Sequence, residues 1–268
     1  MNAIAIDLQG VPETMLWTLH NRAGEAMRPD GVLRDPDAIR IYTAIDYDFE
    51  GHFGKPEGSH AVRARESDLM LSRWLEQHPD GFVVSLGEGL ETQAKRVDNG
   101  RLRWLSVDVP EAIAVRRRFL PETDRFHHLA ASALDPRWMD AVDSSQGVFV
   151  IAQGLFMYFE PADIRQLLSL VAERFAGAEI VFDTIPRWFS RLTIRGLNRT
   201  PQYRVPPMPW GVDRDQIAPL LAAWVPSIRF VDVHRFAMPR GLPRLVETIL
   251  RTLPWFRMKL PSLVHCGV

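Results

Sequence analysis

Short runs of β-branched and aromatic residues alternate with helical patterns through the middle of the chain. Such runs are typical of buried strands, and the patterns between them are typical of helices. The predicted strands are Phe82–Leu86, Leu102–Val107, Phe126–Ala131, Val148–Ala152 and Ile180–Asp183, and the predicted helices are Thr92–Asp98, Pro110–Phe119, Pro136–Asp143 and Pro161–Phe175. Because strands that alternate with helices are joined by right-handed crossovers, the pattern predicts a doubly wound, mainly parallel α/β fold.

The first eighty residues show no strand alternation and are predicted to be helical. Apolar positions within Ile4–Leu19 recur at helical spacing, and Pro12 divides this stretch into two expected helices. The Asp-Pro pair at Asp35 is typical of an N-cap followed by a first helical residue. A further helix is expected over Ala61–Gln77. We therefore expect helices to precede the α/β core.

The chain after the fifth predicted strand departs from this rhythm. Pro186–Trp210 holds five arginines and, near its end, four prolines, which predicts an inserted cap made of a short amphipathic helix and a proline-rich loop. The elements expected after it are helix Arg214–Trp224, strand Ile228–Phe236, helix Leu242–Leu253 and strand Leu263–His265. The expected division is an N-terminal segment 1–80, a core 81–185, an inserted substrate cap 186–213 and the remainder of the core 214–268, within one structural domain built on a seven-stranded sheet.

The composition is that of a folded globular protein of 268 residues, of which 46% are hydrophobic. The formal net charge is −1, so there is no global basic field of the kind that holds nucleic acid. The only cysteine is Cys266, which excludes an internal disulfide and a cysteine-based zinc cage, and we expect no metal. No apolar run is long enough to span a bilayer, and the N-terminus lacks a secretory pattern. These features predict a cytoplasmic protein without stable membrane insertion and leave a homo-oligomer open.

The first predicted strand of the core ends in the turn Gly87-Glu88-Gly89. Glycines let the backbone turn tightly and approach a ligand that a Cβ would exclude. Asp108 ends the second predicted strand, 21 residues after Gly87, where a carboxylate can accept hydrogen bonds from both hydroxyls of a ribose. The glycine turn alone also suits a plain strand-to-helix turn, but together with Asp108 it favours an adenosine-containing ligand.

The turn differs from a dinucleotide-binding fingerprint. The third glycine of that fingerprint would stand at position 92, where this chain has Thr92. Glu88 and Glu91 place negative charge where a pyrophosphate would bind. A cofactor without phosphates fits better, and S-adenosylmethionine carries a ribose, an adenine and a zwitterionic amino acid. A nicotinamide-dependent oxidoreductase is the less favoured alternative.

Several motifs between Arg22 and Phe236 together resemble a known family. They are Ile45–Phe49, Arg63–Arg65, Leu86–Thr92, Val107–Glu111, Ala131–Asp135, Ile151–Phe159 and Val181–Asp183. The sequence is similar to the S-adenosylmethionine-dependent O-methyltransferases related to leucine carboxyl methyltransferases and to tetracenomycin-type polyketide methyltransferases. The resemblance implies a Rossmann-like methyltransferase fold, S-adenosylmethionine as cofactor, and methyl transfer to a carboxylate or hydroxyl oxygen of a small molecule such as a polyketide-like metabolite.

The resemblance also implies roles for single residues. The residues expected at the cofactor are Arg22, Arg65, Gly87, Glu88, Gly89, Asp108, Val109, Leu134, Asp135 and Gln153. Among them, Asp108 is expected to bind the ribose, and Leu134 and Asp135 to flank the adenine. Arg65, assisted by Arg22, is expected to pair with the carboxylate of the cofactor.

Three positions depart from the family pattern, which has Ala at 88, Asp at 91 and Glu at 153. Gln153 lacks the carboxylate that would pair with the ammonium of the cofactor, whereas Glu88 adds a carboxylate nearby. We hypothesise that Glu88 replaces the missing acid in this pairing. The alternative is a degenerate member of the family that binds the cofactor poorly and serves as a binding or regulatory protein.

Two residues are candidates for positioning the acceptor: Tyr158, after the fourth strand, and Asp183, at the end of the fifth. No general base is identified, and a carboxylate acceptor would need none because it is ionised at neutral pH, whereas a phenol would gain from one. Arg187, Arg191 and Arg195 recur every four residues and would share a helical face. That face is either a solvated stripe or a guide for an anionic acceptor.

Overall fold

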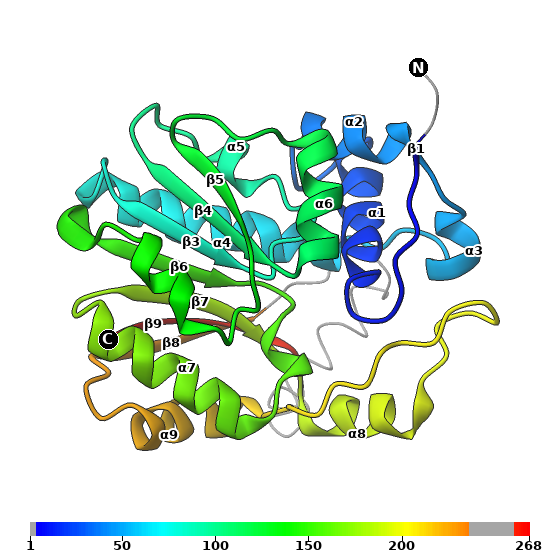
Figure 1. Ribbon diagram of the computed structural model, residues 1–268. Coiled ribbons are helices and arrows are strands. Elements are labelled where there is room, and N and C mark those ends of the chain that lie inside the picture. Colours follow the sequence, from blue (N-terminus) through cyan, green and yellow to red (C-terminus); the bar gives the residue numbers. More distant parts are fainter. Residues whose placement is uncertain (1–3, 236–259) are drawn as a thin grey trace.

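The structure is a computed structural model that describes residues 4–235 and 260–268. Its centre is a seven-stranded sheet in the order β5-β4-β3-β6-β7-β9-β8 (Figure 1). The strands are β3 (Phe82–Leu86), β4 (Arg103–Asp108), β5 (Phe126–Ala130), β6 (Val148–Ala152), β7 (Glu179–Thr184), β8 (Phe230–Arg235) and β9 (Ser262–Gly267). Within this described sheet, β9 is the strand that runs antiparallel to its neighbours. The predicted doubly wound, mainly parallel α/β fold is confirmed.

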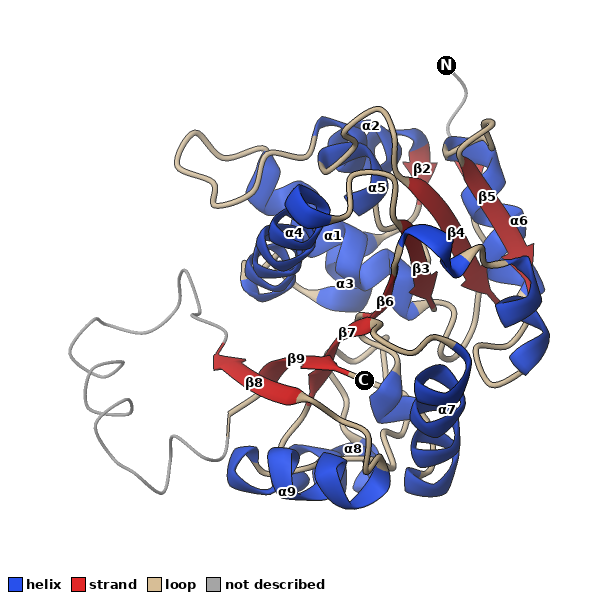
Figure 2. Ribbon diagram, turned by 90° about the vertical axis from the view of Figure 1, so that its left-hand side faces the viewer, coloured by secondary structure: helices blue, strands red, loops and turns tan. Residues whose placement is uncertain are grey.

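Helices cover both faces of the sheet. They are α1 (Thr14–Ala26), α2 (Pro36–Ala44), α3 (Phe49–Phe53), α4 (Ser59–Gln77), α5 (Gln93–Arg96), α6 (Pro110–Phe119), α7 (Pro161–Arg174), α8 (Arg187–Gly196) and α9 (Arg214–Trp224), with the short 3₁₀ helices η1 (Pro136–Ala141), η2 (Ser144–Gln146) and η3 (Phe156–Tyr158). Along β3, Val84 packs with α7 and α9, whereas Val83 packs with α4 on the other face (Figure 2). Burial on both faces explains why the central strands are continuous apolar runs.

Most predicted helices are confirmed, and their boundaries follow the expected caps. The Asp35 side chain accepts a hydrogen bond from the Ala38 backbone and caps α2, as predicted. The helix expected over 92–98 is the shorter α5. The prediction of an α-helix over 136–143 is wrong, because this segment of six residues between Asp135 and Val142 forms a 3₁₀ helix, the form that short connectors commonly take.

The prediction that the chain is helical from Ile4 is wrong. Ile4–Ala5 is strand β1, which pairs in parallel with β2 (Ile45–Asp46), and α1 begins only at Thr14. Ile6 before the helix and Leu16 within it are buried in the same hydrophobic cluster. The apolar spacing therefore reflects a strand, a loop and a helix that fill one core, and not one continuous helical face.

The segment after β7 folds as helix α8 and a long loop, as predicted. The ring of Tyr203 in this loop lies 4.8 Å from that of Phe53 and 6.2 Å from that of Trp17, so the loop packs on the N-terminal helices (Figure 1). The strands expected near 228–236 and 263–265 are confirmed as β8 and β9. The helix expected over 242–253 lies outside the described residues. Among the helices that are described, none has the length and apolar character needed to cross a membrane.

Candidate cofactor and acceptor site

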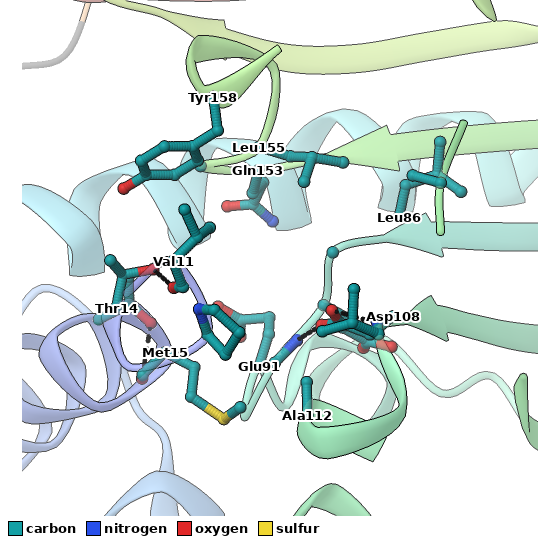
Figure 3. A pocket seen from close by; sticks show the side chains of 18 of the residues that line it. Val11, Thr14, Met15, Leu86, Glu91, Asp108, Ala112, Gln153, Leu155 and Tyr158 are labelled. Carbon is teal, nitrogen blue, oxygen red and sulfur yellow. Dashed lines mark hydrogen bonds between the residues drawn. The ribbon is translucent and has the colours of Figure 1, made fainter. Parts of the chain in front are cut away.

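A cavity of about 320 Å³ opens at the carboxyl ends of β3, β4 and β6. The strand order reverses between β3 and β6, and such a switch point is where open α/β sheets bind ligands. The turn after β3, the ends of β4 and β6, the start of α6, and residues of α1 and α4 line the cavity (Figure 3). The volume suits a small molecule, since such sites range over roughly 300–1,000 Å³.

The glycine turn after β3 forms part of the cavity wall and requires glycine at two positions. Gly87 has φ +62° and Gly89 has φ +53°, both in the left-handed region. A Cβ on Gly89 would lie 2.7 Å from Cβ of Met15, and one on Gly87 would lie 2.7 Å from Cδ1 of Leu155. Backbone conformation and space therefore both explain the Gly-x-Gly pattern.

Asp108 ties the glycine turn to the end of β4. Its Oδ2 accepts a hydrogen bond from the Gly89 backbone at 2.7 Å, and its Oδ1 accepts one from the Val109 backbone at 2.8 Å. Burial raises the pKa of Asp108, and these two amides oppose the shift. Each carboxylate oxygen keeps a second acceptor position, so Asp108 can also accept the two hydroxyls of a ribose. Asp108 and Val109 both line the cavity, where the sequence places them.

Glu88 lines the cavity, but its charge is already paired within the protein. Its Oε1 lies 2.9 Å from Nη2 of Arg116, and its Oε2 accepts a hydrogen bond from Nε1 of Trp104 at 3.1 Å. The Glu88 side chain has 0% exposure. Arg116 also donates to the carbonyl oxygens of Gly89 and Glu91, at 2.9 and 2.7 Å. The hypothesis that Glu88 pairs with the ammonium of the cofactor is therefore corrected, because Glu88 is the buried counter-ion of Arg116.

The arginine at the cavity is Arg63 and not Arg65. Arg63 is 7% exposed, and its Nη1 lies 3.0 Å from Oδ2 of Asp183, while the Gly154 backbone donates to Oδ1 of Asp183 at 2.5 Å. Arg65 is exposed on the face of α4 that also carries the exposed Leu69. Two residues along a helix correspond to a rotation of about 200°. The expectation for Arg65 is corrected on this ground, and Asp183 contacts Arg63 without lining the cavity itself.

Arg22 is buried beneath the glycine turn and does not line the cavity. Its guanidinium donates to Asp35 and to the Leu90 carbonyl, both at 2.7 Å, and lies 3.1 Å from Oε1 of Glu91. Arg96 approaches the same Oε1 at 2.7 Å. Burial alone would raise the pKa of Glu91, but the two guanidiniums outweigh it and hold that pKa at about 2. The expectation that Arg22 assists at the cofactor is corrected, because its contacts support the turn from within the core.

Gln153 stands in the cavity wall directly after β6. Its Nε2 donates to Oε1 of Gln93 at 3.0 Å, and Nε2 of Gln93 donates in turn to Oγ of Ser67 at 3.0 Å. This chain of amides fixes the orientation of Gln153 and leaves its Oε1 buried without a hydrogen-bond partner among the described residues. An unpaired buried acceptor is costly, and an N–H donor of a ligand would satisfy it.

The loop after β5 reaches the cavity through residues other than the two expected at the adenine. Ser132 and Ala133 line the cavity, whereas Leu134 and Asp135 do not. Leu134 packs against the main hydrophobic core, and Asp135 pairs with Arg137 and caps η1. Leu134 and Asp135 therefore lie outside the cavity lining, directly before η1, and their expected contact with the adenine stays a prediction.

Tyr158 lies with Val11 and Thr14 at the end of the cavity away from Asp108 (Figure 3). Burial raises the pKa of Tyr158 to about 12, so its phenol stays protonated and can donate a hydrogen bond. None of the described residues that line the cavity is a histidine. This end is therefore suited to an acceptor with apolar and aromatic character.

The N-terminal part of the chain lines the cavity, whereas the expected cap 186–213 does not. Val11, Thr14, Met15 and Thr18 line the cavity, whereas no described residue of 186–213 does. The arginines expected to share a face of α8 are exposed, as in a solvated stripe; they are Arg187, Arg191 and Arg195. The apolar periodicity near the N-terminus signalled buried residues there but did not show that some of them face a ligand site.

The fold is that of solved Rossmann-like methyltransferases. The structure superposes on the CurJ carbon methyltransferase with a TM-score of 0.56 and 14% sequence identity, covering 96% of this chain and 67% of that one. It superposes on human N-acetylserotonin methyltransferase, solved in complex with S-adenosylmethionine, with a TM-score of 0.50 and 12% identity, covering 78% of this chain and 52% of that one. At such identities the likeness establishes the fold.

Comparison of sequences establishes the family. The chain is 32% identical over 266 residues to the tetracenomycin polyketide synthesis O-methyltransferase TcmP of Streptomyces glaucescens, covering 94% of this chain and 95% of that protein. It is 25% identical over 281 residues to the S-adenosyl-L-methionine-dependent methyltransferase dpfgK of Gibberella zeae, covering 94% and 93%. No protein-family model matches the chain.

The chain therefore belongs to the family of TcmP-like O-methyltransferases and is an S-adenosylmethionine-dependent enzyme. This assignment decides against the nicotinamide-dependent oxidoreductase that the sequence left open. The residues present fit the cofactor. Asp108 can accept hydrogen bonds from the hydroxyls of a ribose, and Oε1 of Gln153, which has no partner among the described residues, can accept one from an ammonium.

Proposed function

We propose that the protein transfers the methyl group of S-adenosylmethionine to a carboxylate or hydroxyl oxygen of a small, polyketide-like acceptor. The observation that carries this proposal is the division of one cavity into a polar end at Asp108 and an apolar, aromatic end at Tyr158 and Val11 (Figure 3). The relative TcmP is an O-methyltransferase of tetracenomycin polyketide synthesis, which supports an acceptor of this chemical class.

Five residues are proposed to hold the cofactor. The ribose would lie at Asp108, and the adenine at Ser132 and Ala133. The carboxylate of the methionyl part would pair with Arg63, whose guanidinium offers two parallel donors. The ammonium would donate to Oε1 of Gln153. This arrangement leaves the end of the cavity near Tyr158 for the acceptor.

The cofactor, when bound, supplies an electrophilic methyl group on a sulfonium. The chain contributes positioning and the exclusion of water, which are the main requirements of an in-line displacement. The Tyr158 phenol, with its pKa near 12, is a hydrogen-bond donor and not a base at neutral pH. Because the described lining also contains no histidine, an acceptor oxygen that is already ionised suits the site best. A carboxylate or an acidic phenol has this property.

The net charge and the single cysteine support the expectations about nucleic acid and cellular compartment. The net charge of −1 is unsuited to nucleic acid, and the buried Cys266 without a disulfide partner suits a reducing compartment such as the cytoplasm. A substrate-cap role for 186–213 would act through the N-terminal helices on which Tyr203 packs. The four-part division of one domain and a homo-oligomeric state stay predictions.

Mass spectrometry of acceptor panels tests the proposal. The purified protein is incubated with S-adenosylmethionine and with matched aromatic acceptors that bear a carboxylate, a phenol or an amine. We expect a gain of one methyl group on a carboxylate or phenol and none on the amine. Methylation of the amine alone, or release of S-adenosylhomocysteine without any methylated oxygen, would contradict the proposed function.

A further inference from the structure

The ammonium of the cofactor requires a negatively charged or hydrogen-bond-accepting group in the cavity. S-adenosylmethionine carries an ammonium and a sulfonium against one carboxylate, so it enters the site with a net positive charge. A buried ammonium is costly unless an anion or several acceptors face it. The carboxylates that line the cavity are Glu88, Glu91, Asp108 and Glu111.

Three of these four carboxylates are either paired within the protein or lie at the end of the cavity proposed for the ribose. Glu88 is fully buried against Arg116. Asp108 holds two backbone amides at the end of the cavity where the ribose is proposed to lie. Glu111 follows Asp108 on α6 at that same end and is exposed to solvent. None of the three is placed to face an ammonium near Gln153.

Glu91 differs because one of its two oxygens is free. The contacts that it makes with Arg22, Arg96 and the Thr92 backbone all fall on Oε1, at 3.1, 2.7 and 2.9 Å. Oε2 accepts no hydrogen bond from the described residues and is not among their fully buried unpaired atoms. Since Glu91 lines the cavity, where Figure 3 labels it, the accessible oxygen opens onto that space.

The surroundings of Glu91 also carry a surplus of negative charge. Three carboxylates share two guanidiniums in one connected network; its members are Asp35, Asp68, Glu91, Arg22 and Arg96. The pKa of Glu91 near 2 keeps this carboxylate ionised throughout the physiological range. Burial raises the pKa of Asp68 to about 6, so above that pH the three carboxylates exceed the two guanidiniums by one negative charge.

We propose that Oε2 of Glu91 supplies the negative charge that faces the ammonium of the cofactor, while Gln153 adds only a neutral acceptor. This inference rests on the proposed function, and it assigns to Glu91 a ligand contact in addition to its place in the ion-pair network. It also explains how the site tolerates an amide at position 153. The charge comes from the glycine turn and not from the end of β6.

Calorimetric titration with two ligands tests this proposal without a turnover assay. S-adenosylhomocysteine carries the ammonium, whereas 5′-methylthioadenosine has the same adenosine but no amino acid. We expect Glu91→Gln to weaken S-adenosylhomocysteine about tenfold, the scale of one charge-assisted contact, and to change 5′-methylthioadenosine less than about twofold. The matched control is Glu111→Gln, which removes a charge from the same cavity and should leave the ratio of the two affinities unchanged.

A second substitution tests the charge itself. Adding Gln153→Glu to Glu91→Gln should restore the affinity ratio to within about threefold of the parent, because it returns an anion to the lining of the same cavity. If Glu91→Gln proves unstable in thermal unfolding, Glu91→Asp keeps the charge on a shorter arm and should still lower the ratio. Equal weakening of both ligands, or an unchanged ratio in both Glu91 variants, would overturn the proposal. A parent protein that shows no preference for S-adenosylhomocysteine would instead overturn the proposed cofactor site as a whole.

Discussion

The Nη1 atom of Arg63 lies 3.0 Å from Oδ2 of Asp183, and this ion pair joins helix α4 to the end of β7. The other carboxylate oxygen of Asp183 accepts a hydrogen bond from the Gly154 backbone, directly after Gln153. The side chains of Arg63 and Asp183 are only 9% and 7% exposed. One carboxylate therefore positions both Arg63 and the loop after β6, which line the cavity together.

Replacement of Asp183 by Asn should separate this positioning role from simple packing. The substitution leaves the Arg63 charge buried without its counter-ion, so we expect stability to fall by about 3 kcal/mol in denaturant unfolding. We also expect S-adenosylhomocysteine to bind at least about tenfold more weakly, with 5′-methylthioadenosine little changed. The control is Asp140→Asn, because Asp140 and its partner Arg174 are 74% and 58% exposed and such pairs contribute at most about 1 kcal/mol. Equal stability of the two variants would contradict the account.

Replacement of Gly89 by Ala tests the glycine turn. The φ of +53° alone costs an L-residue about 1–2 kcal/mol, and the new Cβ would lie 2.7 Å from that of Met15. We therefore expect a larger loss of stability than at Gly100, where φ is +80° and a Cβ would meet nothing within 4 Å. Binding of S-adenosylhomocysteine should weaken in Gly89→Ala and stay unchanged in Gly100→Ala. Thermal unfolding and calorimetry measure both effects, and equal losses in the two variants would show that space at Gly89 is not limiting.

The partly buried His60 predicts how stability depends on pH. Burial, reinforced by the nearby charges of Arg63 and Arg199, lowers the pKa of His60 well below its usual value. The Asn21 carbonyl oxygen accepts from the Glu57 backbone, so the amide nitrogen of Asn21 donates to Nδ1 of His60, at 2.7 Å, and favours the neutral ring. The unfolded chain takes up the proton first, so this contribution to stability is complete above about pH 6.5 and declines as the pH falls below it.

We expect His60→Gln to reduce this pH dependence. Between pH 7 and pH 5.5 the parent should lose about 1 kcal/mol more than the variant in denaturant unfolding, because only the parent must keep this ring neutral. The exposed His127 on β5 provides the control, and His127→Gln should follow the parent curve. A His60→Gln curve parallel to that of the parent would show that other groups determine the acid sensitivity.

The order of elements in the core was predictable because central strands are buried on both faces. The runs at Phe82–Leu86 and Val148–Ala152 are apolar at nearly every position, and the structure places them at the centre of the sheet. The N-terminal strand at Ile4–Ala5 was not predictable, since its two residues pair with the equally short Ile45–Asp46. A period of two cannot be recognised over so few positions.

The site was predictable where a backbone requirement dictates the residue type. Gly87 and Gly89 need positive φ, and Asp108 must end β4 to reach the amide of Gly89. The choice between Arg63 and Arg65 depended on which face of α4 is buried. Since Trp74 lies three turns after Arg63 on the packed side, that helical period could have identified Arg63.

The partner of Glu88 could not be inferred from its local sequence. Arg116 is 28 residues away and stands next to Arg117 and Arg118, which are exposed, so nothing in the run of three arginines marks the buried one. Only the packing of α6 against the glycine turn selects it. Because Glu88 and Arg116 lie so far apart in the sequence, the local motif could not show that Glu88 is paired within the protein.

The orientation of the cofactor in the cavity is the central claim, and one pair of variants tests it most directly. Asp108→Asn and Arg63→Met are titrated with S-adenosylhomocysteine and with 5′-methylthioadenosine. Because both ligands carry the ribose, we expect Asp108→Asn to weaken both by about tenfold or more, whereas Arg63→Met should weaken only S-adenosylhomocysteine. Loss of 5′-methylthioadenosine binding in Arg63→Met, or unchanged binding of both ligands in Asp108→Asn, would contradict the orientation proposed here.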